Sequence, residues 1–266
     1  FNGDGVPCKK RYLRDMESQL LETVIYKDRR GSSKRLRKLM QGDLFPFPKD
    51  ELVIGHYINS FTSNDSIVLD FFSGSATTAH AVMQLNAEDG GNRKFIMVQL
   101  PELTAEDSEA YKAGYDNICK IGEERIRRAG EKIKEEHPEV ADTLDTGFRI
   151  FYVDDSNFNP GVKASPSEYN QQQLDLFADN IKSDRNDLDL LFGSILAWGL
   201  QLDLPMETEE VDGCKIYTVN DGDLVACFAE KVTDKVIEAM AEKEPLRVLF
   251  RDSCFDSDDK KINLFE

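Results

Sequence analysis

The sequence has no long apolar run. Its longest nearly apolar stretch, Leu190–Leu200, has 11 residues, whereas a helix needs about 18 to 20 apolar residues to cross a bilayer. The first 20 residues carry several charged side chains between Lys9 and Glu17, so they lack the apolar core of a signal peptide. The sequence therefore predicts no membrane span and gives no support for secretion.

Cysteine and histidine are scarce and scattered. The five cysteines form no Cys-x-x-Cys pair, and only three histidines accompany them. An odd number of widely spaced cysteines does not indicate a disulfide framework, and their spacing fits no zinc site. We therefore expect no metal site.

Basic charge is in deficit, with 33 Lys and Arg residues against 50 Asp and Glu residues and a formal net charge of −17. Such a charge repels phosphates, so contact with nucleic acid requires a local basic stretch. Lys27–Lys38 is such a stretch, and it is either a DNA-contacting segment or a solvated helix face or loop. Its candidate DNA-contacting side chains are Arg29, Arg30, Lys34, Arg35, Arg37 and Lys38.

What the sequence does contain is the composition of an ordinary folded protein. Apolar residues make up 40% of the chain and aromatic residues 9%, which fits neither a disordered acidic tail nor a fibrous repeat. A length of 266 residues corresponds to one large domain or two small ones.

Helices and strands are expected to alternate in the first part of the chain. Short apolar runs bounded by turn residues predict buried strands at Ile67–Phe72, Lys94–Leu100 and Phe148–Val153. Helical spacing predicts helices over Met16–Tyr26, 52–58, Thr77–Leu85 and Tyr111–Glu136, with a loop at the basic stretch. Strands separated by helices of this length favour a parallel sheet.

A second module is expected beyond a polar linker, Asn157–Asp184. The spacing there predicts helices over 188–199 and Asp234–Glu242. The turn Asn220–Asp223 between two apolar runs predicts a hairpin, and Leu246–Phe250 predicts a strand that is either central in its sheet or an exposed edge. Together these elements predict a small module of helices and an antiparallel sheet.

The stretch that carries chemistry is Asp70-Phe71-Phe72-Ser73-Gly74-Ser75-Ala76-Thr77-Thr78, where a predicted strand turns into a helix. Ligands of an open parallel sheet bind beyond the carboxyl ends of its strands. Gly74 permits a tight turn and a close ligand, and the following helix directs free N–H groups there. The stretch lacks the lysine of a phosphate-binding NTPase loop. It also lacks the Gly-x-Gly-x-x-Gly of nicotinamide-dependent oxidoreductases, which disfavours that class.

This stretch resembles the Asp-x-Phe-x-Gly-Ser-Gly-Thr-Thr signature of amino-methyltransferases. Pro48-Lys49, with the helix after it, is similar to the Pro-Lys-Pro segment of the permuted class of DNA amino-methyltransferases. The segments 88–102, 147–151 and 245–253 are similar to the modification subunits of type III restriction-modification systems. The resemblance covers nearly the whole chain.

The resemblance implies a fold and a cofactor. The fold is α/β, a partial Rossmann-like S-adenosylmethionine-dependent methyltransferase sheet plus a small α+β C-terminal domain. It divides the chain into an N-terminal remnant of a preceding region (1–46), a cofactor-binding α/β domain (47–156), a linker (157–186) and an interaction domain (187–266). The implied cofactor-binding residues are Lys49, Asp70, Phe71, Phe72, Ser73, Gly74, Ser75, Ala76, Thr77, Thr78, Gln99 and Glu102.

Three positions depart from the family's pattern and predict weaker cofactor affinity. Ala76 stands at the last signature glycine, where a methyl group requires an ordinary backbone angle and room beside the ligand. Asp50 replaces the second proline of Pro-Lys-Pro. Gln99 replaces the acidic partner of the ribose hydroxyls, and its amide can bond a hydroxyl without charge assistance. Glu102 is the nearest carboxylate for that role.

Other polar side chains near the signature have two interpretations each. His80 lies one turn into the helix, and we interpret it as packing at the helix–sheet boundary rather than as a base. The hydroxyls of Ser75, Thr77 and Thr78 either contact the cofactor or cap the helix.

The base-holding motif of the family is absent. Its members carry Asp/Asn/Ser-Pro-Pro-Tyr/Phe, which holds the flipped base, and this sequence has no such motif. The permuted class places the motif before the signature, so the chain resembles the C-terminal part of a longer protein and is expected to be inactive alone.

For the intact protein, the resemblance implies a cytoplasmic prokaryotic enzyme that methylates the exocyclic amine of adenine in a short sequence of double-stranded DNA. The implied partners are a second modification subunit and a restriction subunit that hydrolyses ATP. Two alternatives remain open: methylation of the exocyclic amine of cytosine, and a noncatalytic assembly module of a restriction complex.

Overall fold

The structure is a computed structural model that describes residues 24, 25, 27, 29–159 and 180–255. By its internal contacts the chain divides into two units, Phe1–Phe148 and Arg149–Glu266. The helix expected over Met16–Tyr26 falls almost wholly outside the described residues. Within the described ranges, no helix has the length and apolar character that crossing a membrane requires.

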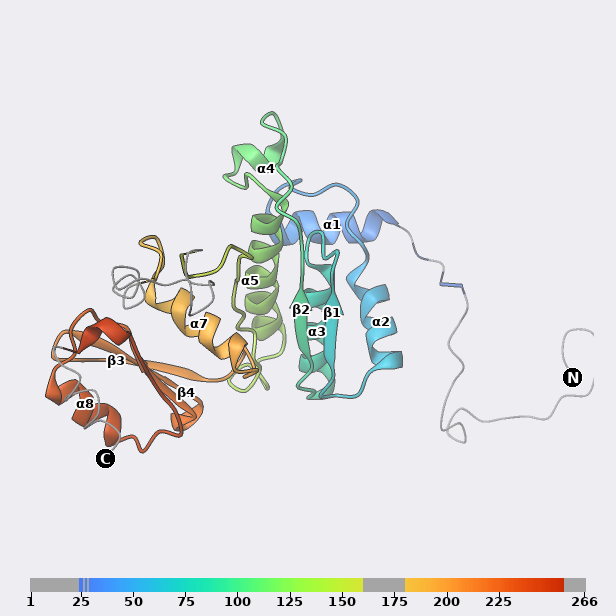
Figure 1. Ribbon diagram of the computed structural model, residues 1–266. Coiled ribbons are helices and arrows are strands. Elements are labelled where there is room, and N and C mark those ends of the chain that lie inside the picture. Colours follow the sequence, from blue (N-terminus) through green and yellow to red (C-terminus); the bar gives the residue numbers. More distant parts are fainter. Residues whose placement is uncertain (1–23, 26, 28, 160–179, 256–266) are drawn as a thin grey trace, which may run out of the picture. The chain divides into compact units, whose positions relative to one another are not determined.

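The first unit contains a pair of strands with helices around it (Figure 1). In chain order its elements are α1 (Arg29–Met40), α2 (Glu51–Phe61), β1 (Ile67–Asp70), α3 (Thr77–Asp89), β2 (Lys94–Met97), α4 (Glu109–Lys112) and α5 (Ile118–Glu136). β1 and β2 are parallel, with Asp70 opposite Met97 at their carboxyl ends. The expected order of strand, helix and parallel strand is confirmed, because parallel neighbours need such a crossover.

Helix α3 lies at the centre of the first unit's core. Nine of its 13 residues are buried. Ala79 and Met83 pack in one cluster with Ile133 of α5, and Val82 packs in another with Ile58 of α2. Because several sides of α3 are covered, its apolar residues are not confined to one stripe.

The two faces of the β1–β2 pair differ in their cover. Val68 and Phe95 pack against the cluster that α2 and α3 share, whereas Ile67, Leu69 and Ile96 are each at least half exposed. Successive side chains of a strand point to opposite faces. One face of the pair therefore carries helices, and the other presents apolar side chains.

Helix α1 corrects the expectation of a loop at the basic stretch. Leu36 and Met40 are buried in a cluster with Ile121 of α5, so one side of α1 is anchored in the core. This burial outweighs the weak helix propensity of Gly31-Ser32-Ser33, because tertiary packing supplies most of the stability of a helix in a protein.

The single helix expected over Tyr111–Glu136 is two helices. Between α4 and α5, Gly114 has a left-handed backbone with φ of +93°. Asn117 is the N-cap of α5, and its side-chain oxygen accepts from Lys120 N at 3.1 Å. A left-handed glycine ends a helix and an Asn cap starts one, so these two residues explain the break.

The strand expected at Phe148–Val153 does not form. Arg149 instead donates from Nη2 to the carbonyl oxygen of Leu204 at 2.8 Å. Phe151 packs edge-on against Phe192, with ring centroids 5.0 Å apart. These contacts lie inside the second unit, so the described part of the first sheet has two strands.

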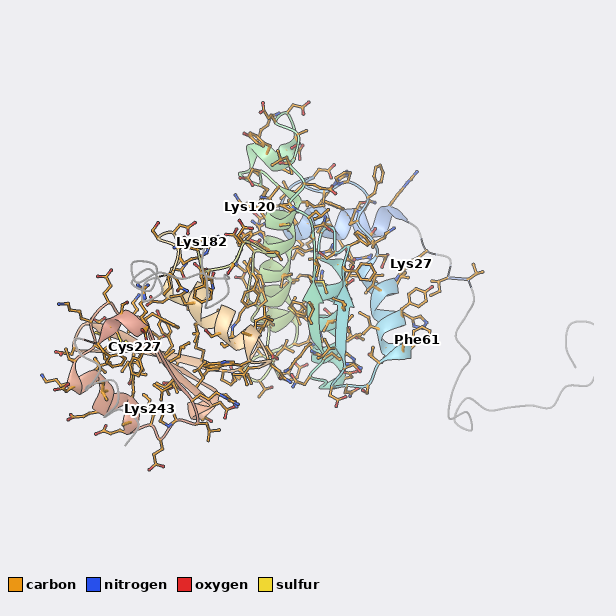
Figure 2. The ribbon with its side chains drawn as sticks, viewed as in Figure 1. Lys27, Phe61, Lys120, Lys182, Cys227 and Lys243 are labelled. Atoms are coloured by element: carbon orange, nitrogen blue, oxygen red, sulfur yellow. The ribbon has the colours of Figure 1, made fainter. Side chains whose placement is uncertain are left out.

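The second unit contains a four-stranded sheet in the order β3-β4-β5-β6. Its elements are α7 (Asp187–Ala197), β3 (Met206–Val211), β4 (Cys214–Val219), β5 (Leu224–Cys227), α8 (Asp234–Ala241) and β6 (Val248–Phe250), with short 3-10 turns at Asn220–Gly222 and Asp252–Cys254. Tyr217 packs in a cluster with α7, and its neighbour Ile216 packs in a cluster with α8. The two helices therefore cover opposite faces of the sheet. Cys227, labelled in Figure 2, is fully buried among the α8 cluster.

Two expectations for the second unit are corrected. The hairpin of β4 and β5 around Asn220–Asp223 is confirmed, but β6 runs parallel to β5, so the sheet is mixed rather than antiparallel. β6 also ends the described sheet, so the central placement of Leu246–Phe250 is wrong. β3 matches no expected strand, because Met-Glu-Thr-Glu-Glu-Val has no apolar alternation. Its turn, Asp212-Gly213, has positive φ at both residues and is a hairpin signal that the sequence does contain.

Candidate cofactor site

The signature residues Asp70–Thr78 form a tight turn between β1 and α3. Gly74 is left-handed, with φ of +53°, a conformation that glycine adopts without steric cost. The turn is fastened to the end of β2, because Ser73 N donates to Val98 O at 3.2 Å and Val98 N donates to Asp70 O at 2.8 Å. The carboxyl ends of both strands thus meet at the turn, as an open-sheet ligand site requires.

The carboxylate of Asp70 braces the turn from inside. Its Oδ1 accepts from Phe72 N at 3.2 Å, and its Oδ2 accepts from the Thr78 hydroxyl at 2.6 Å. Bonds to an ionised acceptor are among the stronger hydrogen bonds in proteins. Asp70 therefore ties the start of the turn to the first residues of α3.

Gln99 reaches the turn from the end of β2. Its Oε1 accepts from Gly74 N at 2.8 Å, and its Nε2 donates to Leu100 O at 3.2 Å. Its amide oxygen is thus engaged with the turn itself. Glu102, three residues later, has an exposed side chain, and its backbone oxygen accepts from Ile118 N at 2.9 Å.

Ala76 has the left-handed backbone that its methyl group disfavours. Its φ is +56° and its ψ is +40°, and it is 3% exposed. We expected an alanine at the last signature position to require a negative φ, and the observed φ of Ala76 is positive. An alanine held there stores strain of about 1 kcal/mol, as a glycine at the same position would not.

Ser75 and Thr77 are buried and bonded to Arg125, a residue that the sequence did not single out. Arg125 Nη1 donates to the Ser75 hydroxyl at 2.9 Å and to the Thr77 hydroxyl at 2.7 Å. The N-cap of α3 is Ala76, and no side chain caps it. The hydroxyls of Ser75 and Thr77 therefore do not act as the helix cap.

The solvent side of the turn is apolar and aromatic. Phe71 and Phe72 are 62% and 78% exposed, with ring centroids 5.1 Å apart. Phe45 lies next to the turn, since its Cζ is 3.7 Å from where a Cβ on Gly74 would be. Lys49, four residues on, is exposed. Phe45, in the segment before α2, thus lies beside the signature turn.

Asp50 owes its place to helix capping. Its Oδ1 accepts from Leu52 N at 3.0 Å and from Val53 N at 3.4 Å, which makes it the N-cap of α2. A proline at this position offers no such acceptor. The departure from Pro-Lys-Pro therefore replaces one helix-starting residue with another.

We expect Asp50→Ala to lower the free energy of unfolding by about 1 to 2 kcal/mol, because it removes the cap and leaves Arg35 without one partner. Denaturant unfolding measures the change. Asp43→Ala is the matched control, since it removes a carboxylate from the exposed Arg37–Asp43 pair and surface pairs contribute little. Equal effects of the two substitutions would contradict the capping role.

The basic stretch is only partly available to DNA. Arg35 is ion-paired with Asp50 at 2.9 Å and with Glu51, and Arg37 pairs with Asp43. Of the remaining candidates, Arg30, Lys34 and Lys38 have exposed side chains, and Arg29 begins α1.

Residues 9–128 match the DNA methylase family, a range that includes the signature turn, α2 and the first half of α5. This match places the part of the chain between residues 9 and 128 in the DNA methylase family. The described residues contain no group of three or more acidic, histidine and cysteine side chains that could hold a metal ion.

The chain is similar to the modification (Mod) subunits of type III restriction-modification enzymes. It is 35% identical over 177 residues to the StyLTI Mod subunit of Salmonella typhimurium, covering 65% of this chain and 25% of that protein. It is 30% identical over 258 residues to the EcoP15I Mod subunit of Escherichia coli, covering 93% and 37%. It is 29% identical over 267 residues to the EcoPI Mod subunit of Escherichia phage P1, covering 96% and 40%. The chain thus spans a quarter to two fifths of the length of these curated relatives.

Proposed function

We propose that the protein acts as the modification subunit of a type III restriction-modification system and methylates the exocyclic amine of adenine in double-stranded DNA. S-adenosylmethionine would supply the methyl group. The observation that carries the proposal is the signature turn at the carboxyl ends of two parallel strands, in a chain that aligns with type III Mod subunits over 93% and 96% of its length.

The residues around the turn suit S-adenosylmethionine. The N-terminus of α3 has no side-chain cap, so its first N–H groups remain directed at the site. Phe71 and Phe72 offer exposed apolar faces to an adenine ring. Gln99 and Glu102, which follow β2, are the acceptors that the resemblance assigns to the ribose hydroxyls.

Methyl transfer by the full-length protein tests the proposal. DNA incubated with the protein and S-adenosylmethionine is digested to nucleosides and analysed by mass spectrometry. N6-methyladenine supports the proposal, and N4-methylcytosine favours the cytosine alternative. Absence of any methylated base, with restriction-complex assembly intact, favours the noncatalytic module.

Cofactor binding separates the methyltransferase from an oxidoreductase. S-adenosylmethionine, its demethylated product and NAD are titrated into the full-length protein by calorimetry. We expect heat from the first two and none from NAD. Binding of NAD alone would overturn the proposal.

We expect residues 1–266 alone to methylate no DNA and to bind S-adenosylmethionine weakly, because the base-holding motif is absent from this sequence. The full-length protein, assayed in parallel, is the control. Turnover by residues 1–266 at the rate of the full-length protein would show that the family's motif is dispensable.

We also propose that the second unit makes protein–protein contacts, with a second modification subunit and with a restriction subunit. Glu207 and Glu210 of β3 are exposed and acidic, which disfavours direct contact with DNA phosphates. The alternative is a unit that only stabilises the cofactor fold.

Deletion of residues 187–266 from the full-length protein distinguishes the two roles. We expect the deletion to reduce oligomer size and binding of the restriction subunit, measured by light scattering and pull-down with the purified subunit. Unchanged assembly with a lower unfolding temperature would contradict the interaction role.

A further inference from the structure

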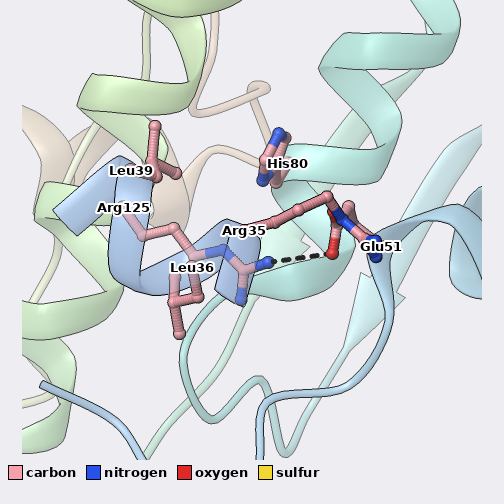
Figure 3. A pocket seen from close by; sticks show the side chains of 6 residues that line it. All are labelled: Arg35, Leu36, Leu39, Glu51, His80 and Arg125. Atoms are coloured by element: carbon pink, nitrogen blue, oxygen red, sulfur yellow. Dashed lines mark hydrogen bonds and ion pairs between the residues drawn. The ribbon is translucent and has the colours of Figure 1, made fainter. Parts of the chain in front are cut away.

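A buried ionic cluster lies behind the signature turn, among α1, α2, α3 and α5. Figure 3 shows the side chains that line a small cavity at its centre: Arg35, Leu36, Leu39, Glu51, His80 and Arg125. Arg125 is 1% exposed and Glu51 is 8% exposed. A charged side chain is rarely buried this fully unless it is paired, and Arg125 and Glu51 are paired with each other.

Arg125 makes all its hydrogen bonds to the turn through one nitrogen, Nη1. Besides the two hydroxyls, Nη1 donates to the backbone oxygen of Ser75 at 3.3 Å. The oxygens of Ser75 and Thr77 that it bonds lie on both sides of the left-handed Ala76. One guanidinium group thus holds both flanks of the strained position.

The other end of the guanidinium is held by α2. Arg125 Nη2 lies 3.9 Å from Glu51 Oε2, and Glu51 also pairs with Arg35 of α1. Glu51 is the first residue of α2, directly after Lys49 and Asp50. Arg125 therefore connects the two segments that the resemblance assigns to the cofactor, the turn and the start of α2.

The charge on Arg125 persists at neutral pH despite its burial. Burial lowers the pKa of Arg125 to about 10, and the charge of Glu51 opposes that effect. An apolar side chain of similar size would fill the space without the cost of desolvating a charge. Such a side chain would not donate hydrogen bonds to Ser75 and Thr77. The guanidinium group therefore contributes by holding the turn in its observed conformation.

We propose that Arg125, held by Glu51, is a positioning residue that fixes the signature turn in the conformation that binds S-adenosylmethionine. The inference rests on the proposed function, because it concerns the same cofactor. Arg125 is buried behind the turn and acts through Ser75 and Thr77.

The test compares Arg125→Met and Arg125→Lys with wild type in the full-length protein. Arg127→Met is the matched control, because Arg127 lies on the same helix, is exposed and pairs with Glu124. Calorimetry gives the Kd for S-adenosylmethionine well below the unfolding midpoint of each variant, and steady-state kinetics give KM for cofactor and for DNA separately.

We expect Arg125→Met to raise the Kd and KM for S-adenosylmethionine by about tenfold to 100-fold, as displacement of a binding element by about 1 Å does. KM for DNA should stay within about twofold, since Arg125 donates to Ser75 and Thr77 of the turn, whereas the exposed DNA-contact candidates Lys34 and Lys38 lie on α1. Arg125→Lys keeps the charge but has fewer hydrogen-bond donors, so its Kd should lie between those of wild type and Arg125→Met. The Kd of Arg127→Met should match that of wild type.

A second comparison keeps the inference testable if Arg125→Met does not fold. Thr77→Val removes one acceptor of Arg125, and it is combined with Arg125→Lys in a double-mutant cycle of cofactor affinity. A shared role predicts that the double variant loses less than the product of the single losses. Fully multiplicative losses, or an Arg125→Met variant with wild-type cofactor affinity and a lower unfolding temperature, would overturn the inference while leaving the proposed function intact. A wild-type protein that binds no S-adenosylmethionine would overturn both.

Discussion

Gly122→Val should lower the free energy of unfolding by about 2 to 3 kcal/mol, whereas Gly122→Ala should be neutral or stabilising. Gly122 is on α5, where the helix passes closest to the signature turn. A Cβ at Gly122 would lie 3.4 Å from the Cβ of Ala76 and 3.6 Å from the carbonyl oxygen of Gly74. A single methyl group therefore fits, and the two further methyl groups of valine must enter the turn.

The contrast between the two substitutions arises because helix propensity and packing act in opposite directions. Alanine in a helix is favoured over glycine by about 1 kcal/mol, and the contact at 3.4 Å offsets part of this gain. Valine adds overpacking against a turn that Asp70 and Arg125 already hold. The cofactor affinity should fall with Gly122→Val for the same reason.

Urea unfolding followed by circular dichroism gives the stabilities, and calorimetry gives the cofactor affinity. Gly130→Ala provides a comparison on the same helix, because its Cβ would come within 2.8 Å of the Thr146 Cβ. Equal stability of Gly122→Val and Gly122→Ala would show that the turn leaves room for a larger side chain at Gly122.

The stability of the protein should fall as the pH drops from 6.5 towards 3, and His80 should account for about 4 to 5 kcal/mol of this loss. His80 is 8% exposed on the buried side of α3. Burial, and then the charges of Arg125, Lys132 and Arg35, lower the pKa of His80 from 6.5 to about 3. Glu51, which lines the same cavity, does not reverse this direction.

The sign follows from the two states of the imidazole. Below pH 6.5 the unfolded chain binds a proton at His80, while the folded protein keeps His80 neutral until the pH reaches about 3. Folding therefore loses about 1.4 kcal/mol for each pH unit within this window. Above pH 6.5 His80 is neutral in both states, so it contributes nothing to the pH dependence of stability there.

Denaturant unfolding of wild type and His80→Gln between about pH 7 and pH 4 isolates this contribution from that of the carboxylates. We expect a flatter profile for His80→Gln. His56→Gln, which removes an exposed histidine of α2, should follow wild type. Parallel profiles for wild type and His80→Gln would show that the folded protein accepts a proton at His80.

The strands and the turn of the cofactor site could be predicted because their signals are local. Ile67–Phe72 and Lys94–Leu100 are short apolar runs between turn residues, and both contain the observed strands β1 and β2. His80 is buried, as its interpretation as a packing residue requires, but it lines a cavity with residues of α1, α2 and α5 and not with residues of the sheet. Local signals suffice where the chain's own turn chemistry sets the boundary.

The residues behind the turn could not be predicted, because their partners are distant in sequence. Arg125 lies in a heavily charged helix, where an arginine is usually solvated, and Ser75 is 50 residues away. A faint signal exists, since Arg125 shares the helical stripe of Ile118, Ile121 and Ala129. A charged residue on an otherwise apolar helical stripe indicates a buried ion pair, but the spacing of residues in the sequence does not identify the residue that pairs with it.

At helix α1 the local sequence predicts a loop, but contacts with distant residues make the segment helical. Gly31-Ser32-Ser33 favours a loop, but Leu36 and Met40 of the same helix are buried against Ile121 and other residues far along the chain. Tertiary contacts decide the conformation wherever propensity is weak.

The acidic edge strand β3 has a consequence for aggregation. An exposed edge presents unpaired backbone groups on which a strand from another molecule can add. Two copies of β3 meeting edge to edge would bring Glu207 and Glu210 of one molecule against the same carboxylates of the next, in molecules that each carry a net charge of −17. The charge that makes this unit a poor surface for phosphates thus also opposes pairing between the β3 strands of two molecules, and added salt weakens that repulsion by screening.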